Sequence, residues 1–256
     1  MNGKGISSFL FQLVQQNHDG LPQKAGFPQA ALNEIHGSWY DPSNPVVMMD
    51  GQLRDDLFAD LLHWEQRADL VLALGTSMCG MNADRVFTTV AEKTKRKIEA
   101  GGRPGGGGVI VGLQRTQHDS LACLRIYAPA DDVMKLLAEE LGFATTLRDC
   151  AFRRGGEWSL PMRVPYDQYG HRTDGSETTL LDLREGARVR ISAGPYAGDE
   201  GEVIGTNLEG HIRIVFNHKL HPKKPLRRPF ERVLGLWWIE AAEAGSVVQM
   251  AIVNVT

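Results

Sequence analysis

The sequence predicts an α/β fold in which a mostly parallel sheet is followed by a small, all-β barrel. In the first 145 residues, short apolar segments bounded by turn residues alternate with helical patterns. After residue 182 the apolar residues recur with a period of two, which is typical of half-buried strands. At about 150 residues per domain, the 256 residues suffice for two domains. We therefore expect a first domain over residues 1–144, a linker or surface wrap over 145–182 and a barrel over 183–256.

Alternating elements define the first domain. Five apolar segments are short enough to be buried strands: residues 11–14, 46–49, 70–74, 109–113 and 124–127. Three segments repeat apolar residues at helical spacing: residues 54–66, 82–100 and 131–141. This alternation predicts a mostly parallel sheet that helices cover on both faces. The glycine-rich stretch at residues 101–108 is expected to be a flexible connector rather than a phosphate-binding loop.

Short strands define the second domain. Five segments with turn residues between them predict its strands: residues 187–192, 202–205, 211–216, 233–239 and 247–253. So many short strands in about 70 residues favour a small barrel. If residues 233–239 form a strand, Trp237 and Trp238 point to opposite faces, so we expect one in the core and the other exposed.

Composition excludes several classes of protein. Apolar residues make up 42% of the chain and charged residues 23%, which excludes a wholly disordered protein. The net charge of −3 excludes a polycation that coats nucleic acid along its whole length. Cys79, Cys123 and Cys150 have neither disulfide nor zinc-ligand spacing, as expected in a reducing compartment. No apolar run approaches the roughly 20 residues that span a bilayer. We expect an intracellular protein, cytoplasmic or nuclear, without membrane contact.

A polar cluster follows the first predicted strand. Residues 16–21 read Gln-Asn-His-Asp-Gly-Leu, and residues 34–37 read Glu-Ile-His-Gly. In open α/β folds, ligands bind at the carboxyl edge of the sheet, where such a cluster lies. Asn and Asp side chains there can hold sugar hydroxyls, and a histidine can act as a general base. Taken alone, each pattern is equally typical of turn chemistry or of a structural histidine, so these alternatives stay open.

Together, the order and spacing of these residues resemble the sirtuins, the NAD-dependent protein deacylases. Gln16, Asn17, Asp19 and His36 fall on the positions that line the nicotinamide pocket of that family. The resemblance implies that His36 is the base that helps a ribose hydroxyl of NAD attack the alkylated acyl intermediate. It also implies that Asn17 and Asp19 position nicotinamide and its ribose, so that Asn17, Asp19 and His36 form the catalytic set.

Two later segments extend the resemblance to residues 9–142. Residues 68–77 end in Gly75, Thr76 and Ser77, like the sirtuin strand whose backbone and hydroxyls contact the cofactor. Residues 109–114, with Leu113, resemble the later cofactor-binding strand and are most similar to the nuclear class IV type. The resemblance implies a partial Rossmann-like parallel sheet, NAD as cofactor and an acylated protein as partner.

The chain also departs from the sirtuin pattern. No Gly-Ala-Gly-x-Ser loop, which holds the NAD pyrophosphate in the family, precedes Gln16, so we expect an N-terminally truncated sirtuin. Residues 38–45 stand where the family has a zinc module with two cysteine pairs, so no zinc is expected. Residues 48–51 replace a Phe-Gly-Glu, and Gly112 replaces the Asn expected to hold the adenosine ribose. Because charge-assisted bonds to pyrophosphate contribute about 1.5–3 kcal/mol each, we expect weakened or absent deacylase activity.

The second domain carries its own resemblance. Residues 186–191 and 194–203 resemble the KOW motif, the strand–turn–strand opening of SH3-like barrels, which bind RNA in some families and protein in others. Interleaved prolines predict an extended loop over residues 218–232. Its cations are candidates for contacting RNA phosphate or an acidic surface: Lys219, Lys223, Lys224, Arg227 and Arg228. A solvated loop beside the barrel explains the same charges, and this alternative stays open.

Two function hypotheses follow. In the first, the chain is a sirtuin-type NAD-dependent deacylase that its barrel delivers to an acylated protein. In the second, the sirtuin-like half is a catalytically inactive scaffold, and the KOW-like barrel binds RNA or a larger protein assembly. Gln16, Asn17, Asp19 and His36 favour the first hypothesis, whereas the missing phosphate loop and Gly112 favour the second.

Overall fold

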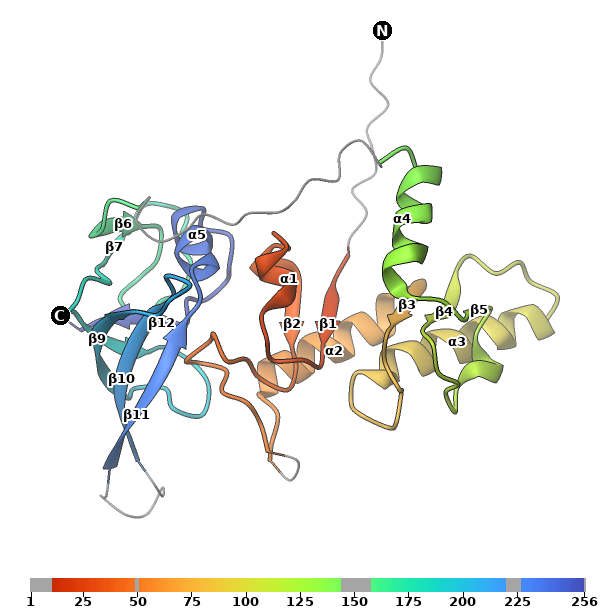
Figure 1. Ribbon diagram of the computed structural model, residues 1–256, viewed down its shortest axis with the longest axis horizontal. Coiled ribbons are helices and arrows are strands. Elements are labelled where there is room, and N and C mark those ends of the chain that lie inside the picture. The colour runs from red at the N-terminus through yellow and green to blue at the C-terminus, as the bar shows by residue number, and fades with distance from the viewer. Residues whose placement is uncertain (1–10, 49–50, 144–157, 220–226, 256) are drawn as a thin grey trace, which may run out of the picture. The chain divides into compact units, whose positions relative to one another are not determined.

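The computed structural model describes residues 11–48, 51–143, 158–219 and 227–255 (Figure 1). Contacts between residues group the chain into two compact units. The first unit combines Met1–Arg54 with Cys150–Thr256, and the second unit consists of Asp55–Asp149. The predicted domain boundaries at residues 144 and 182 stay a prediction.

The second unit contains a three-stranded parallel sheet in the order β3-β4-β5. Its strands are β3 (Leu70–Leu74), β4 (Gly107–Val111) and β5 (Leu124–Ile126), and a 3-10 turn, η2 (Asp119–Leu121), precedes β5. Its helices are α2 (Asp55–Arg67), α3 (Asp84–Glu99) and α4 (Ala130–Glu140). The strands and helices predicted for this region, and the parallel arrangement of the strands, are therefore confirmed.

Helix α3 covers one face of this sheet and forms the core with it. Phe87 and Ala91 of α3 are buried together with Ala73 of β3 and Ile110 of β4. Gly108 permits this contact, because a Cβ atom there would lie 2.5 Å from Cε2 of Phe87. The end of the glycine-rich stretch is therefore part of β4 rather than of a flexible connector.

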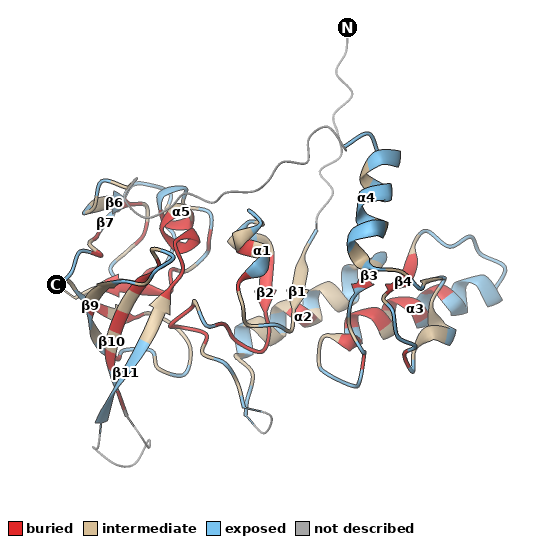
Figure 2. Cartoon of the chain, viewed as in Figure 1, coloured by how far each residue is buried: buried red, intermediate tan, exposed pale blue. Residues whose placement is uncertain are grey.

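Within this unit only one face of β3 is packed against a helix, and the prediction that helices cover both faces of the sheet stays a prediction. Leu70, Leu72 and Leu74 are 58%, 43% and 41% exposed, whereas Ala73 between them is buried. Successive side chains of a strand point to opposite faces, and within this unit the face that carries Ala73 is the one that meets α3. Helix α4 is also exposed along most of its length (Figure 2).

The N-terminal part of the first unit is built on a two-stranded parallel sheet. β1 (Leu13–Gln15) pairs with β2 (Leu32–Glu34), and the connection between them holds α1 (Leu21–Lys24) and a 3-10 turn, η1 (Gln29–Ala31). The predicted first strand is thus confirmed, with its start shifted toward the polar cluster that follows it.

The strand predicted at residues 46–49 is wrong for residues 46–48, which belong to no strand. Met49 lies outside the described residues. A backbone bond from the Val47 N–H to the His36 carbonyl (3.0 Å) holds this stretch against the preceding loop. Pro45, which lacks an N–H group, stands just before Val46 and prevents a longer ladder from starting there.

The C-terminal part of the first unit is a five-stranded antiparallel sheet in the order β11-β10-β9-β8-β12. Its strands are β8 (Arg188–Ile191), β9 (Glu200–Thr206), β10 (Ile212–Lys219), β11 (Arg227–Leu234) and β12 (Ile252–Asn254). In the described part of the chain, the edge strands β11 and β12 do not pair with each other, so the sheet is open. The antiparallel sheet is confirmed, whereas its closure into a barrel stays a prediction.

The continuous strand predicted at residues 233–239 is wrong. β11 ends at Leu234, and after Gly235 the chain forms a helix, α5 (Trp237–Glu243). Trp237 and Trp238 are both buried, at 5% and 8% exposure, instead of facing opposite sides of a sheet. The Glu-Ala-Ala-Glu sequence that follows them has a high helix propensity, which overrides the apolar pattern.

The extended loop predicted at residues 218–232 is in part a hairpin. β10 continues to Lys219 and β11 starts at Arg227, with these two residues opposite each other. Pro229 fits within β11 because an edge strand leaves one of its sides without a partner strand. Lys223 and Lys224 lie outside the described residues.

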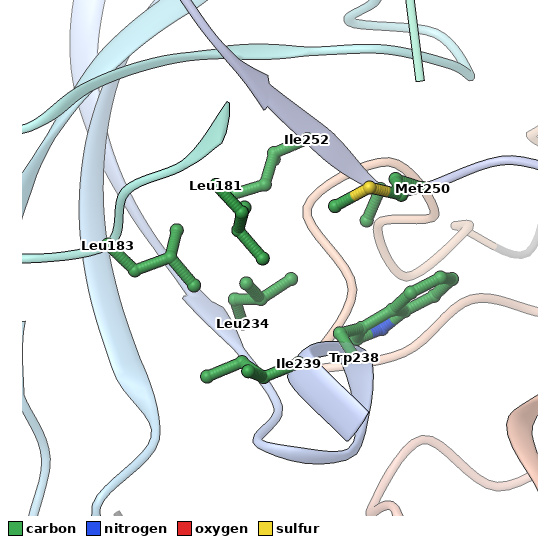
Figure 3. Close-up of a pocket in the computed structure, with 8 residues that line it drawn as sticks. Leu181, Leu183, Leu234, Trp238, Ile239, Met250 and Ile252 are labelled. Carbon is green, nitrogen blue, oxygen red and sulfur yellow. The ribbon is translucent and has the colours of Figure 1, made fainter. Parts of the chain in front are cut away.

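Residues 158–183 add side chains to the core of the first unit. β6 (Met162–Val164) and β7 (Thr179–Leu181) pair with each other, and Val164, Tyr166 and Leu181 are buried. An apolar cavity of about 10 Å³ in this core has the following lining (Figure 3): Leu181, Leu183, Leu234, Trp238, Ile239, Met250, Ala251 and Ile252. A space of about one water molecule without polar lining is a packing defect rather than a ligand site. Across the described residues, no helix combines the length and apolar character needed to traverse a membrane.

We predict that Tyr166→Phe lowers the free energy of unfolding by about 1–3 kcal/mol. The fully buried Tyr166 hydroxyl donates to the Val247 carbonyl (3.0 Å), and the substitution leaves that buried carbonyl without this donor. Urea unfolding followed by tryptophan fluorescence measures the loss. Tyr169→Phe is the matched control, because Tyr169 is 58% exposed, and its effect should stay within about 0.5 kcal/mol. Equal losses in the two variants would contradict the prediction.

Candidate functional site

Two loops of the first unit meet at the carboxyl edge of the parallel sheet. The register pairs Gln15 of β1 with Glu34 of β2, so the segments that follow these strands leave the sheet side by side. The Trp39 N–H donates to the His18 carbonyl (3.0 Å), and Nδ1 of His18 lies 2.7 Å from the Gly37 carbonyl oxygen. The structure thereby brings the predicted residues of the first loop, 16–19, next to the loop that carries His36.

The predicted residues of the first loop differ in exposure. Asn17 is exposed, Gln16 and Asp19 are half-buried, and His36 on the second loop is buried. Asp19 accepts the Leu21 N–H (3.1 Å) and so fixes the start of α1. The Gln16 Nε2 atom is buried and has no hydrogen-bond partner among the residues that the structure describes. A buried donor without a partner is costly, so this atom is a candidate for binding an acceptor.

A buried carboxyl group, that of Glu34, lies two residues before His36 in the sequence. Glu34 is 3% exposed, and burial, reinforced by the nearby Asp41 carboxyl, raises its pKa to about 8. Hydrogen bonds from Ser38 and Gln23 oppose this shift without cancelling it. Glu34 therefore carries a proton at pH 7. The sequence analysis missed this residue, although an acidic residue between Asn33 and Ile35 of a fully buried strand was a signal that could have found it.

An aromatic junction joins these loops to the antiparallel sheet. We define it as Tyr40, His211 and Trp237, whose ring centroids lie 4.7 to 5.2 Å apart. Gly20 packs on this junction with φ +66°, and a Cβ atom there would lie 2.8 Å from Cη2 of Trp237. A backbone bond from the Gly235 N–H to the Tyr40 carbonyl (2.9 Å) fixes the same contact.

Charged groups surround the junction. Glu209 accepts hydrogen bonds from Lys24 (3.2 Å) and from the Tyr40 hydroxyl (3.3 Å). Nδ1 of His211 accepts the Leu236 N–H (3.2 Å), which places the proton of the neutral ring on Nε2, 3.2 Å from the Glu209 carboxylate. Burial lowers the pKa of His211, so the ring stays neutral at pH 7. The sequence analysis missed this junction because its members come from distant parts of the chain.

The second unit carries the other predicted cofactor residues. Gly75 follows β3 with φ +62°, and a Cβ atom there would meet nothing within 4 Å, so the backbone is open to a ligand. Thr76 Oγ1 accepts the Met78 N–H (3.2 Å), and Ser77 is exposed. Leu113 follows β4 and is 72% exposed. These residues belong to the ends of two neighbouring parallel strands of one sheet.

Arg125 shapes the loop after β4. Its guanidinium donates to the Gly112 carbonyl (3.1 Å), and its Nε donates to Asp119 (3.1 Å). Hydrogen bonds from Thr116, and then from Tyr127 and Arg125, hold the pKa of Asp119 well below its usual range. Arg125 and Asp119 thus position the loop that carries Leu113. Both lie within residues 9–142, the range that the resemblance covers, and the sequence analysis assigned neither of them this role.

The predicted contact residues of the hairpin are only partly described. Arg227 and Arg228 are exposed on β11, and Lys219 ends β10. Within the described ranges, no group of three or more His, Cys, Asp or Glu residues is arranged to hold a metal ion. The expected absence of zinc stays a prediction.

Comparisons with known proteins place this geometry in context. No family model matches the sequence. The NAD-dependent protein deacetylases sirtuin-7 of Homo sapiens and Mus musculus are each 27% identical to it, over 217 and 227 residues, which cover 68% and 72% of this chain. The chain is distantly homologous to the sirtuins. It spans about half the length of these sirtuins, 51% and 53%.

Solved sirtuin structures give a weaker match. A Sir2 structure with the inhibitor EX-527, 2'-O-acetyl-ADP-ribose and a deacetylated p53 peptide is 22% identical, with a TM-score of 0.42 over 52% of this chain and 65% of that chain. A Sir2 structure with a p53 peptide and NAD+ is 21% identical, with a TM-score of 0.41 over 51% of this chain and 63% of that chain.

We predict that the stability of the protein falls with rising pH through the titration of Glu34. Its folded pKa of about 8 lies above the ordinary value of 4.5, so the folded state holds a proton that the unfolded state has lost between these values. The contribution of protonated Glu34 to the free energy of unfolding is fully present below pH 4.5 and is lost as the pH rises to about 8. The free energy of unfolding falls by up to about 1.4 kcal/mol per pH unit in this range.

Denaturant unfolding of the wild type and Glu34→Gln at several pH values tests this prediction. Glu34→Gln should gain stability relative to the wild type as the pH rises from 5 to 8.5. Glu185→Gln, which changes an exposed glutamate of the same unit, is the control and should follow the wild type. A difference between Glu34→Gln and the wild type that does not vary with pH contradicts the assignment.

We predict that Gly20→Ala destabilises the first unit more than Gly186→Ala does. Both glycines have positive φ, +66° and +85°, but a Cβ atom at Gly186 meets nothing within 4 Å. The difference between the two losses in unfolding free energy reports the steric overlap of the new Cβ atom with Trp237. This overlap should add about 1–3 kcal/mol to the loss in Gly20→Ala. Thermal unfolding of both variants provides the measurement, and equal losses would show that the junction does not constrain Gly20.

Proposed function

We propose that this protein is a sirtuin-like NAD-dependent protein deacylase of weakened activity. The observation that supports the proposal most is the meeting of two loops at one edge of the parallel sheet, which sets His36 beside residues 16–19. The distant homology to the sirtuin-7 proteins, named as NAD-dependent protein deacetylases, supports the same activity.

The donor set of the first loop fits an amide-bearing cofactor. The Gln16 Nε2 atom, buried without a partner among the described residues, would donate to the carboxamide oxygen of nicotinamide. The exposed Asn17 amide would bind the same end of NAD, and Asp19, held by the Leu21 N–H, would bind a ribose hydroxyl. In the sirtuin family, NAD supplies the ribose that receives the acyl group.

His36 would serve as the general base of this site. It is buried, and its loop is fixed on both sides by the bonds that its backbone carbonyl and the Gly37 carbonyl make with Val47 and His18. An imidazole held in this way can take a proton from a ribose hydroxyl without reorganising its loop. Glu34, two residues earlier, is neutral at pH 7 and adds no negative charge to this segment.

Gly75, Thr76, Ser77 and Leu113 of the second unit are the further cofactor-binding residues that the resemblance implies. Open backbone at Gly75 and the exposed Ser77 suit this role. Gly112 lacks the side chain that would hold the adenosine ribose, and this supports weakened rather than full affinity for NAD. An acylated protein would be the substrate, in an intracellular setting.

A scaffold function is the second candidate. The observation that favours it is the exposure of Arg227 and Arg228 on an edge strand of the antiparallel sheet, beside Lys219. In this reading the sheet belongs to the KOW type of SH3-like barrel and holds RNA or a protein assembly, and Lys223 and Lys224 join the contact.

Calorimetric titration with NAD tests the proposed deacylase. We predict that the wild type binds NAD and that Asn17→Ala weakens binding about fivefold or more, because one hydrogen bond to a ligand contributes about 1 kcal/mol or more. His36→Ala should bind NAD nearly as the wild type does but lose deacylation of an acetylated peptide, measured by nicotinamide release.

His171→Ala is the control for the histidine substitution, since the His171 side chain is 59% exposed and pairs with Asp167 on the surface. No heat at millimolar NAD from folded wild-type protein would exclude the deacylase and leave the scaffold. Full activity of His36→Ala would instead exclude His36 as the base.

A further inference from the structure

We propose that the hairpin end of the β10–β11 face is a binding site for single-stranded nucleic acid. We call it the arginine–aromatic cluster and define it as Tyr196, His218, Arg228, Phe230 and Arg232. The proposal does not depend on the deacylase activity; it rests on the scaffold candidate, which it narrows to one ligand and one place. Apart from Arg228, the sequence analysis did not select these side chains.

Arg232 is a half-buried cation that has no counter-ion among the residues the structure describes. Its guanidinium carbon lies 5.5 Å from the ring centroids of both Tyr196 and Phe230, and its Nε is 3.4 Å from Nε2 of His218. Among the described residues no carboxylate pairs with it, and burial lowers its pKa. A desolvated charge without a partner is costly, and an external anion would offset that cost.

Two other arginines of the same sheet, Arg213 and Arg227, are already paired with carboxylates. Arg213 forms two bonds to Glu231 (2.8 and 3.0 Å), and Arg227 donates to Asp199 (3.0 Å). Arg228, like Arg232, has no ion pair with any residue that the structure describes, and its guanidinium lies 5.7 Å from the ring of Phe230. Arg228 and Arg232, the two arginines that flank Phe230, therefore carry positive charge that no carboxylate of the described residues neutralises.

A hydrogen-bonded chain orients Arg232. Nδ1 of His218 lies 2.9 Å from Oδ2 of Asp199, so the neutral ring donates there and presents Nε2 as an acceptor to Arg232. Tyr196 stacks on His218 with ring centroids 4.1 Å apart. These contacts occupy the Nε side of the guanidinium and leave its terminal N–H groups available to a ligand.

Phe230 supplies a stacking surface between the two cations. It is 42% exposed although it pairs with the fully buried Phe216 across the strands. Arg228, Phe230 and Arg232 alternate along β11 and therefore share one face, about 6.8 Å apart at each step. An exposed ring set between arginines is how proteins bind bases and phosphates of an unpaired strand. An acidic peptide would use the arginines but would leave the ring without a role.

Fluorescence anisotropy with a labelled oligouridylate, using the full chain, tests the proposal. Arg232→Gln and Phe230→Leu should each weaken binding roughly fivefold or more. Arg232→Gln should also reduce the slope of log affinity against log salt by about 0.7, whereas Phe230→Leu should leave it unchanged. Arg213→Gln is the matched control, because Arg213 is paired to Glu231, and it should bind like the wild type.

Circular dichroism establishes whether each variant is folded. If Arg232→Gln does not fold, Phe230→Leu still tests the proposal. Wild-type protein that does not bind the oligonucleotide at low salt overturns the proposal. Tighter binding to polyglutamate than to oligouridylate, or wild-type affinity in folded Phe230→Leu, also overturns it, in favour of an acidic protein partner. The result does not depend on NAD binding, so it separates this site from the deacylase.

Discussion

The packing of Tyr40 and Gly20 against Trp237 is the contact on which the first unit depends. The parallel sheet of β1 and β2 has three residues per strand, too few to be stable in isolation. Its loops gain their stability from the antiparallel sheet, through the aromatic junction and the Gly235-to-Tyr40 backbone bond. Any change that loosens Trp237 is therefore expected to move the loops that carry the candidate site.

This dependence links the chemistry of the candidate site to the C-terminal sheet. Asp19 adjoins Gly20, which rests on Trp237, and His36 lies four residues before Tyr40. The buried groups nearby are neutral, because burial raises the pKa of Glu34 and lowers that of His211. Recognition of an uncharged amide such as nicotinamide needs hydrogen bonds rather than an opposing charge, so the neutral state of these two buried groups is compatible with it.

Local pattern predicted the second unit well, since β3, β4, β5 and their helices follow directly from apolar spacing. The same reasoning failed at Trp237, where helix propensity after Gly235 outweighs an apolar run that also fits a strand. It could not find Glu34 or the aromatic junction either. Their properties arise from burial and from contacts across about 170 residues of sequence, which periodicity does not record.

Most buried polar groups of the antiparallel sheet find hydrogen-bond partners within the fold, whereas Arg232 has no carboxylate partner among the described residues. His218 and His211 are neutral and hydrogen-bonded, and Asp199 is held by both His218 and Arg227. Arg232 breaks this rule, because its neighbours are aromatic rings and a neutral imidazole. A folded chain retains such a desolvated cation at a cost in stability, and an anionic partner at the same place explains why that cost is tolerated.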